Sequence, residues 1–432
     1  MRTALACATW LALGLPCAAL FWRRGRRELA IALLPFAGAL ALTLPVALAP
    51  WLDGSLAHWT LRAALCALLL AGCAALLLRG IAPVPPSRGG PVRGAFSLAA
   101  LAIASLLLVA TGATLAADGW PGYGWDGLSI WLVRAKVLAQ SAELPAALFR
   151  EPQLVQGHWD YPLLLPALLA WFARFADLEV RQLALALGVI AACFVPAQAL
   201  GLWRTLPAPA AVALALAPLA VPGLAVTHFN AYADPLLVFA STAGFAWSAQ
   251  GAIRRDGARV AAGGLALARA AGAPHRVALG TCLRCALPGL AVFALWRATC
   301  TRLGVPDTLP SGLRFDLLEA RGAELAAALR DFLGAPQHAL VLAACIGAAI
   351  ALAGGGVRTR AARVAALLAA PALYGAGLAV VYLATPHALD WHLATSLPRT
   401  AFGLAPACLV AALLAPILAA TAPGPRHTRS PT

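Results

Sequence analysis

Charged residues are scarce in this sequence. Only 11% of its 432 residues are Asp, Glu, Lys or Arg, and only 17 are acidic. A soluble domain carries about 25% charged residues, so a chain with 62% hydrophobic residues and a mean hydropathy of +0.81 falls outside that class. We therefore expect an all-α polytopic membrane protein, because helices satisfy their own backbone hydrogen bonds in lipid.

Two further signals are missing, a metal-binding cysteine pattern and a signal-peptide cleavage site. The ten cysteines are scattered, mostly in apolar runs where cysteine behaves as a small hydrophobic residue. Only Cys282 and Cys285 have CxxC spacing, and no second pair accompanies them. No polar, small-residue cleavage site follows the first apolar run, so we expect a retained helix there.

The excess of basic residues, which gives a net charge of +15, is concentrated in short clusters between apolar runs. Such clusters mark cytoplasmic loops, so we expect a cytoplasmic (inner) membrane protein and no nucleic-acid partner. With these clusters inside, the N-terminus is predicted to lie outside and the basic tail in the cytoplasm. The clusters are Arg23–Glu28, Arg79–Arg93, Arg254–Arg259, Arg358–Arg363 and Arg426–Arg429.

Long apolar runs recur along the chain, and about 20 residues suffice to cross a bilayer as a helix. We expect about eleven spans, grouped as an N-terminal three-helix module (1–94), a core (95–260) and C-terminal helices with a cytoplasmic tail (261–432). The predicted spans are Ala4–Phe21, Leu29–Pro50, Thr60–Leu78, Ala95–Ala117, Arg181–Leu202, Ala208–Val226, Asp234–Gln250, Val277–Trp296, His338–Ala353, Val364–Leu383 and Thr400–Ala420.

The apolar run Tyr161–Phe175 begins within the motif "HWDYPLLLP" and is too short to cross a bilayer. Its 15 residues would reach only about 22 Å as a helix, against a hydrocarbon core of roughly 30 Å. We expect a re-entrant or interfacial helix on the outer face, capped by Asp160 and started by Pro162.

Two outer loops are expected to carry amphipathic helices in the headgroup layer. The first loop, 118–160, also holds an aromatic belt of Trp120, Tyr123, Trp125, Trp131 and Trp159. Its apolar face is Leu128, Trp131, Leu132, Ala135, Leu138 and Ala139, away from Arg134, Lys136 and Gln140. The second loop, 297–337, starts at Arg297 and has Leu318, Leu325, Leu329, Phe332 and Leu333 near one face, with Glu319, Arg321, Glu324 and Arg330 mostly elsewhere.

Two of the few acids, Asp126 and Asp234, are expected near the outer membrane surface. Either residue could cap a helix, Asp126 on "DGLSIW" and Asp234 on the span that Pro235 begins. The predicted topology places both outside, where they could also converge on one site.

The order of motifs "WDGLSIWLVRAKVL", "HWDYPLLLP", "NAYADPLL" and "DWHLATSLPRT" resembles the GT-C superfamily of polytopic glycosyltransferases, especially protein-mannosyltransferase-like and aminoarabinose-transferase-like membrane proteins. The resemblance implies a polyprenyl-phosphate sugar donor and a glycan, lipid or protein acceptor. Asp126 matches the catalytic aspartate of the family's first outer loop, and Asp234 matches its second acidic residue. Tyr161 and Pro162 match its Tyr-Pro element. Arg181 matches an arginine that often follows the re-entrant element.

These residue types suit sugar transfer from a lipid phosphate, which needs a base on the acceptor and cations on the phosphate. We expect Asp126 to be the base and Arg181 and Arg399 to bind the phosphate. Asp160 and Tyr161 are further candidate substrate-binding residues. His158, His392 and Asp234 could assist the acceptor or hold a divalent cation, although their pattern does not define a metal site.

Two departures from the family pattern leave alternatives open. Leu163 stands where the family usually has a second proline. Over Leu265–Gly289, arginines and cysteines interrupt the apolar run that a span would need. That stretch is either a frame-shifted segment or a cytoplasmic loop running into a divergent native span. The alternatives to an active transferase are a catalytically inactive relative or a transporter or flippase of lipid-linked sugars, although repeats and mid-span charges typical of transporters are missing.

Overall fold

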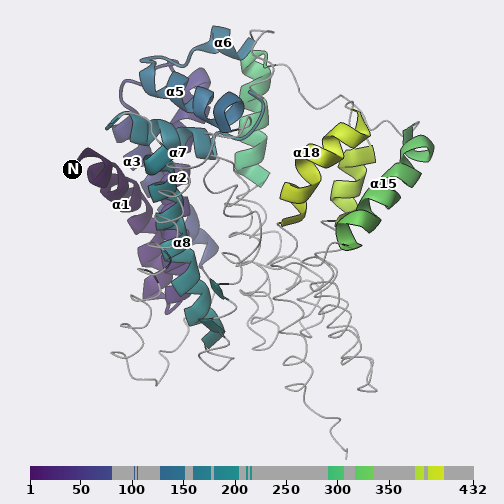
Figure 1. The fold of residues 1–432 in the computed structure, drawn as a ribbon. Coiled ribbons are helices and arrows are strands. Elements are labelled where there is room, and N and C mark those ends of the chain that lie inside the picture. The colour runs from purple at the N-terminus through teal and green to yellow at the C-terminus, as the bar shows by residue number, and fades with distance from the viewer. Residues whose placement is uncertain are drawn as a thin grey trace, which may run out of the picture. The chain divides into compact units, whose positions relative to one another are not determined.

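The computed structural model is helical. It describes residues 1–79, 102, 105, 127–150, 159–176, 180–203, 211–212, 215–216, 290–305, 317–334, 375–383 and 388–402, and these contain no strand beyond an isolated bridge between Ser55 and Glu143. The chain divides into two compact units. Unit 1 comprises Met1–Phe239 and Ala286–Gly312, and unit 2 comprises Ala240–Cys285 and Leu313–Thr432 (Figure 1).

Four helices of unit 1 are long and apolar enough to cross a membrane, which supports the membrane class read from composition. Their bounds nearly coincide with four predicted spans, while the other seven lie wholly or mostly outside the described residues, so the count of about eleven stays a prediction. The four are α1 (Arg2–Arg23), α2 (Arg27–Leu48, continued by η1, Ala49–Trp51), α3 (Trp59–Leu77) and α8 (Val180–Trp203).

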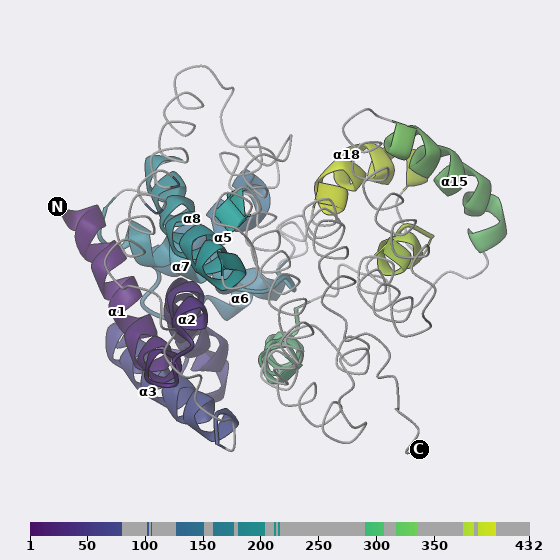
Figure 2. The same ribbon diagram turned by 90° about the horizontal axis from the view of Figure 1, so that it is seen from below.

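The backbones of α1 and α2 touch through glycines, and α3 lies beside them (Figure 2). A Cβ atom at Gly14 would stand 1.9 Å from the Leu34 carbonyl oxygen, and one at Gly38 would stand 2.2 Å from that of Trp10. Close packing over small residues is how membrane helices gain dispersion contacts when lipid competes for apolar surface. The Trp10 indole nitrogen donates to the Pro35 carbonyl at 2.8 Å, which adds a buried polar tie.

The short apolar helix α7 (Leu164–Ala173) packs against α1 and α2. Eight of its ten residues are buried, and its length of about 15 Å is half the thickness of a hydrocarbon core. Trp171 donates to the Ala6 carbonyl and meets Trp59 edge-on at 6.1 Å. Thus α7 is packed inside protein.

The predicted start of α7 is wrong. The helix has Leu163 at its N-cap with no side-chain cap, and the Leu163 carbonyl accepts its first bond from Ala167 at 2.8 Å. Asp160 and Pro162 therefore precede the helix and neither caps nor opens it. Tertiary contacts explain the later start of the helix, because the side chains of Arg134 and Trp296 donate to the carbonyls of residues 159–161.

The turn after α2 and the segment 142–144 lie at the same end of unit 1. The Leu56 amide donates to the Ala142 carbonyl, and the Leu144 amide to the Gly54 carbonyl, each at 2.7 Å. The cluster Arg23–Glu28 joins α1 to α2 at the opposite end of α2. This is the arrangement that the predicted topology requires, and which end faces outward stays a prediction.

Cysteine labelling of intact cells tests that orientation. In a variant whose native cysteines are replaced, Glu143→Cys should react with a membrane-impermeant maleimide, because Glu143 is exposed at the predicted outer end. Arg23→Cys, also exposed, and Arg254→Cys should react only after permeabilisation. Equal labelling of Glu143→Cys and Arg23→Cys in intact cells would contradict the topology.

Candidate functional site around Arg134

The helix predicted for the first outer loop is present, and its described part begins at Gly127. It consists of a π-helical turn, η2 (Gly127–Leu132), and α5 (Val133–Gln140), and both pack against α7. Burial follows the predicted pattern at most positions, since Lys136 and Gln140 are exposed. Leu128 departs from it, because this residue of the predicted apolar face is 48% exposed. The buried apolar residues are Trp131, Leu132, Ala135 and Leu138.

Arg134 breaks this pattern, and its placement on the polar face is wrong. Its side chain is 0% exposed, and its Nη2 donates to the carbonyls of Tyr161 at 2.6 Å and Trp159 at 3.4 Å. The guanidinium also lies 5.8 Å from the centre of the Trp159 ring, within the range of a cation–π contact. Arg134 therefore joins α5 to the segment before α7.

A second donor reaches the same segment from far along the chain. Trp296, on the helix 290–303, donates its indole N–H to the Asp160 carbonyl at 2.8 Å. This helix continues past Arg297, so the expectation that Arg297 starts an outer loop is wrong. It ends at Gly304, whose φ of 68° lies in the left-handed region that suits glycine.

The end of the helix 290–303 is bonded to η1 and α6 (Ala146–Arg150), which keeps it in unit 1. Arg302 donates to the Pro50 carbonyl at 2.6 Å and lies over the Trp51 ring at 4.8 Å. Arg150 donates to the Leu303 carbonyl. These bonds place the chain after the divergent stretch Leu265–Gly289 in the same fold as α2 and α5.

Trp159, Asp160 and Tyr161 are enclosed by aromatic residues. Trp159 is 3% exposed with Phe149 at 4.8 Å between ring centres, and Tyr161 has Trp131 at 6.0 Å. Trp131 and Trp159 thus lie in the protein interior and not in the predicted aromatic belt. Asp160 is also buried, whereas Tyr161 stays partly exposed.

The charge of Arg134 survives its burial. Loss of solvent lowers the pKa of Arg134 to about 9, and the neighbouring Cys300 and Asp160 side chains partly offset that decrease. Since this pKa is still above neutrality, the guanidinium stays protonated, and its hydrogen bonds to the two carbonyls are charge-assisted.

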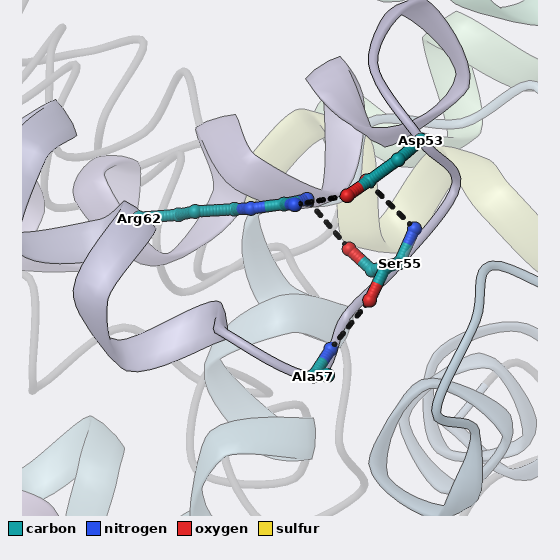
Figure 3. Close-up of polar contacts among 4 residues, drawn as sticks. All are labelled: Asp53, Ser55, Ala57 and Arg62. Atoms are coloured by element: carbon teal, nitrogen blue, oxygen red, sulfur yellow. Dashed lines mark hydrogen bonds and ion pairs between the residues drawn. The ribbon is translucent and has the colours of Figure 1, made fainter.

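The turn between α2 and α3 has its own set of polar contacts (Figure 3). Arg62 and Asp53 form an ion pair at 2.6 Å, and Asp53 also accepts the Ser55 amide at 3.0 Å. The Arg62 hydrogen bond, with the Ser55 amide, lowers the pKa of Asp53 to about 2. Because Asp53 is exposed, we assign the pair to shaping the turn, which then pairs with 142–144.

The other predicted site residues are only partly described. Asp126, His158 and Asp234 lie outside the described residues. Arg181 is in the first turn of α8, and Arg399 lies within α18 (Leu389–Phe402), but their side chains are not described. Arg399 stands ten residues after the start of α18 and directly before the predicted span Thr400–Ala420, which lies mostly outside the described residues.

His392 belongs to unit 2, where α18 packs on the helix 375–383 and on α15 (Leu318–Gly334). The Tyr382 and His392 ring centres are 5.1 Å apart. Ser396 donates to the His392 carbonyl at 2.8 Å, so the Tyr382 hydroxyl donates to Ser396 at 3.0 Å. The expected helix α15 is present, and it buries Leu325 against this cluster while Leu329 stays exposed.

No group of three or more His, Cys, Asp or Glu lies close enough to hold a metal ion within the described part of the chain. Of the candidate ligands His158, His392 and Asp234, only His392 is in that part, so a divalent cation stays a prediction.

Sequence reasoning missed Arg134 and Trp296. A signal for Arg134 was present, since it stands three residues after Trp131 and four before Leu138 and therefore shares their helical face. No such signal indicated Trp296, because it contacts Asp160 across 136 positions of the sequence.

No protein-family model, no curated protein and no solved structure matches this chain.

Proposed function

We propose that this protein is a membrane glycosyltransferase that moves a sugar from a polyprenyl-phosphate donor to a glycan, lipid or protein acceptor on the outer face of the cytoplasmic membrane. One observation carries the proposal. The helix that directly follows Asp126 contacts the Tyr-Pro segment through the Arg134 bonds and the Trp131–Tyr161 ring pair. The two motifs that the GT-C resemblance links to one active site are therefore neighbours in unit 1.

The chemistry assigned to these residues is acid–base and electrostatic. A lipid phosphate is a good leaving group, so the enzyme needs a base to take the acceptor proton and cations to hold the phosphate. Asp126 is the proposed base, with Asp234 as the second acid. Arg181 and Arg399 are the proposed phosphate ligands, and the partly exposed Tyr161 is a proposed substrate contact.

The burial of α7 supports its assignment as a re-entrant helix. At membrane depth, irregular backbone is tolerated only where protein satisfies its polar groups. The segment 159–161 meets that condition, since its three carbonyls all receive side-chain donors. We assign α5 and α15 to the outer membrane surface, where they would lie at the donor headgroup.

Donor binding tests the proposal before any acceptor is known. Purified wild type should bind a fluorescent polyprenyl-phosphate sugar, and Arg399→Ala should weaken binding about tenfold, because it removes one charge-assisted contact to phosphate. Arg330→Ala is the matched control, since Arg330 is an exposed arginine on α15 of the same unit. Absence of binding by the wild type would reject the proposed function, and equal affinities of the two variants would reject Arg399 as a ligand.

A further inference from the structure

We propose that Arg134 and Trp296 are positioning residues: together they clamp three successive backbone carbonyls, those of Trp159, Asp160 and Tyr161, and so fix the segment that carries the candidate substrate contacts. The catalytic part of this inference rests on the proposed glycosyltransferase function. Its structural part rests only on the hydrogen bonds.

The clamp donates to carbonyls that α7 does not use. The first carbonyl to accept a helical bond in α7 is that of Leu163, so the carbonyls of residues 159–161 receive none from the helix. Trp159 and Asp160 are buried, at 3% and 7% exposed. A buried carbonyl left without a donor is costly, so removing a donor favours rearrangement of the segment.

The clamp restrains the segment in more than one direction. Its donors come from α5 and from the helix 290–303, which are separated by more than 140 residues of sequence. The guanidinium is planar and binds two of the carbonyls, while the indole binds the one between them. Ring contacts from Phe149 and Trp131 then fix the side chains of Trp159 and Tyr161.

Arg134 is distinguished from a phosphate ligand by its burial. Its side chain is 0% exposed, and at least two of its hydrogen-bonding directions are used by backbone carbonyls. A headgroup phosphate cannot reach it without dismantling the clamp. Its effect on catalysis is therefore indirect, through the orientation of Asp160 and Tyr161.

Trp296→Phe tests the clamp with the smallest change in volume. Phenylalanine keeps an aromatic ring but lacks the N–H that binds the Asp160 carbonyl. Trp10→Phe is the control, because it removes a buried indole-to-carbonyl bond of the same 2.8 Å length in the same unit, to Pro35. Both variants should lose similar thermal stability.

The two variants should differ at the site. In Trp296→Phe, we expect kcat to fall at least about tenfold with the donor KM within about twofold, because misplacement of reacting groups by about 1 Å can cost a factor of 100. Amide hydrogen exchange of residues 159–163 should also accelerate at least about tenfold. Trp10→Phe should leave kcat and this exchange close to wild type.

The outcomes separate the clamp from the proposed function. Equal kcat values and equal exchange in the two variants would overturn the clamp. If the wild type shows no turnover with any donor, the proposed function fails and hydrogen exchange alone decides: faster exchange confined to Trp296→Phe supports the clamp, and unchanged exchange overturns it.

Discussion

Asp126→Asn should abolish sugar transfer while leaving the fold and donor binding intact. Asparagine has nearly the same shape as aspartate and caps a helix as well, so the start of η2 is expected to keep its structure. It lacks the basic carboxylate that takes the acceptor proton. Since general base catalysis contributes about 10²–10⁴-fold, turnover should fall by at least about 100-fold.

Asp53→Asn is the matched control for this substitution. Asp53 lies on the turn after α2, where its carboxylate is exposed and pairs with Arg62. Loss of this exposed pair should change stability little and turnover not at all. Single-turnover rates with a radiolabelled lipid-linked sugar would measure the difference, and near-wild-type rates in Asp126→Asn would reject Asp126 as the base.

Arg134→Met should destabilise unit 1 more than any surface change. Methionine fits the helix and approximates the length of the arginine side chain, but it donates no hydrogen bond. The carbonyls of Trp159 and Tyr161 would lose their donor, and the buried Asp160 would lose a neighbouring positive charge. A buried acceptor that loses its donor costs about 1–3 kcal/mol, so a loss of a few kcal/mol is expected.

Thermal or denaturant unfolding in detergent measures this loss of stability. Arg330→Met on α15 is the control, because Arg330 is exposed and a change there should stay within about 0.5 kcal/mol. Equal stabilities of the two variants would show that the Arg134 bonds are not maintained in solution.

The four helices of unit 1 that could cross a membrane were predictable, because long apolar runs mark α1, α2, α3 and α8 in the sequence. The shortness of Tyr161–Phe175 separated α7 from them. Helix ends were less predictable where tertiary bonds decide them. Arg297 looked like the start of a loop, yet the helix continues because Thr299 and Arg302 find partners on α2 and η1.

The candidate site was predictable in its motifs and not in its geometry. The order of the motifs indicated that the regions of Asp126 and Tyr161 belong together, and the Trp131–Tyr161 contact agrees with that. The prediction placed Arg134 on the polar face because an arginine on a helix is normally assigned there. Only the fold shows that Arg134 and Trp296 donate to the carbonyls of Trp159, Asp160 and Tyr161.

The most direct test of the account is transfer by the purified wild-type protein in liposomes. Polyprenyl-phosphate donors with a radiolabelled sugar would be supplied together with candidate glycan, lipid and protein acceptors. We expect the label to leave the polyprenyl phosphate and become covalently attached to an acceptor, and Asp126→Asn should abolish this transfer. Label that stays on the lipid, whether immobile or carried intact across the bilayer, would contradict it.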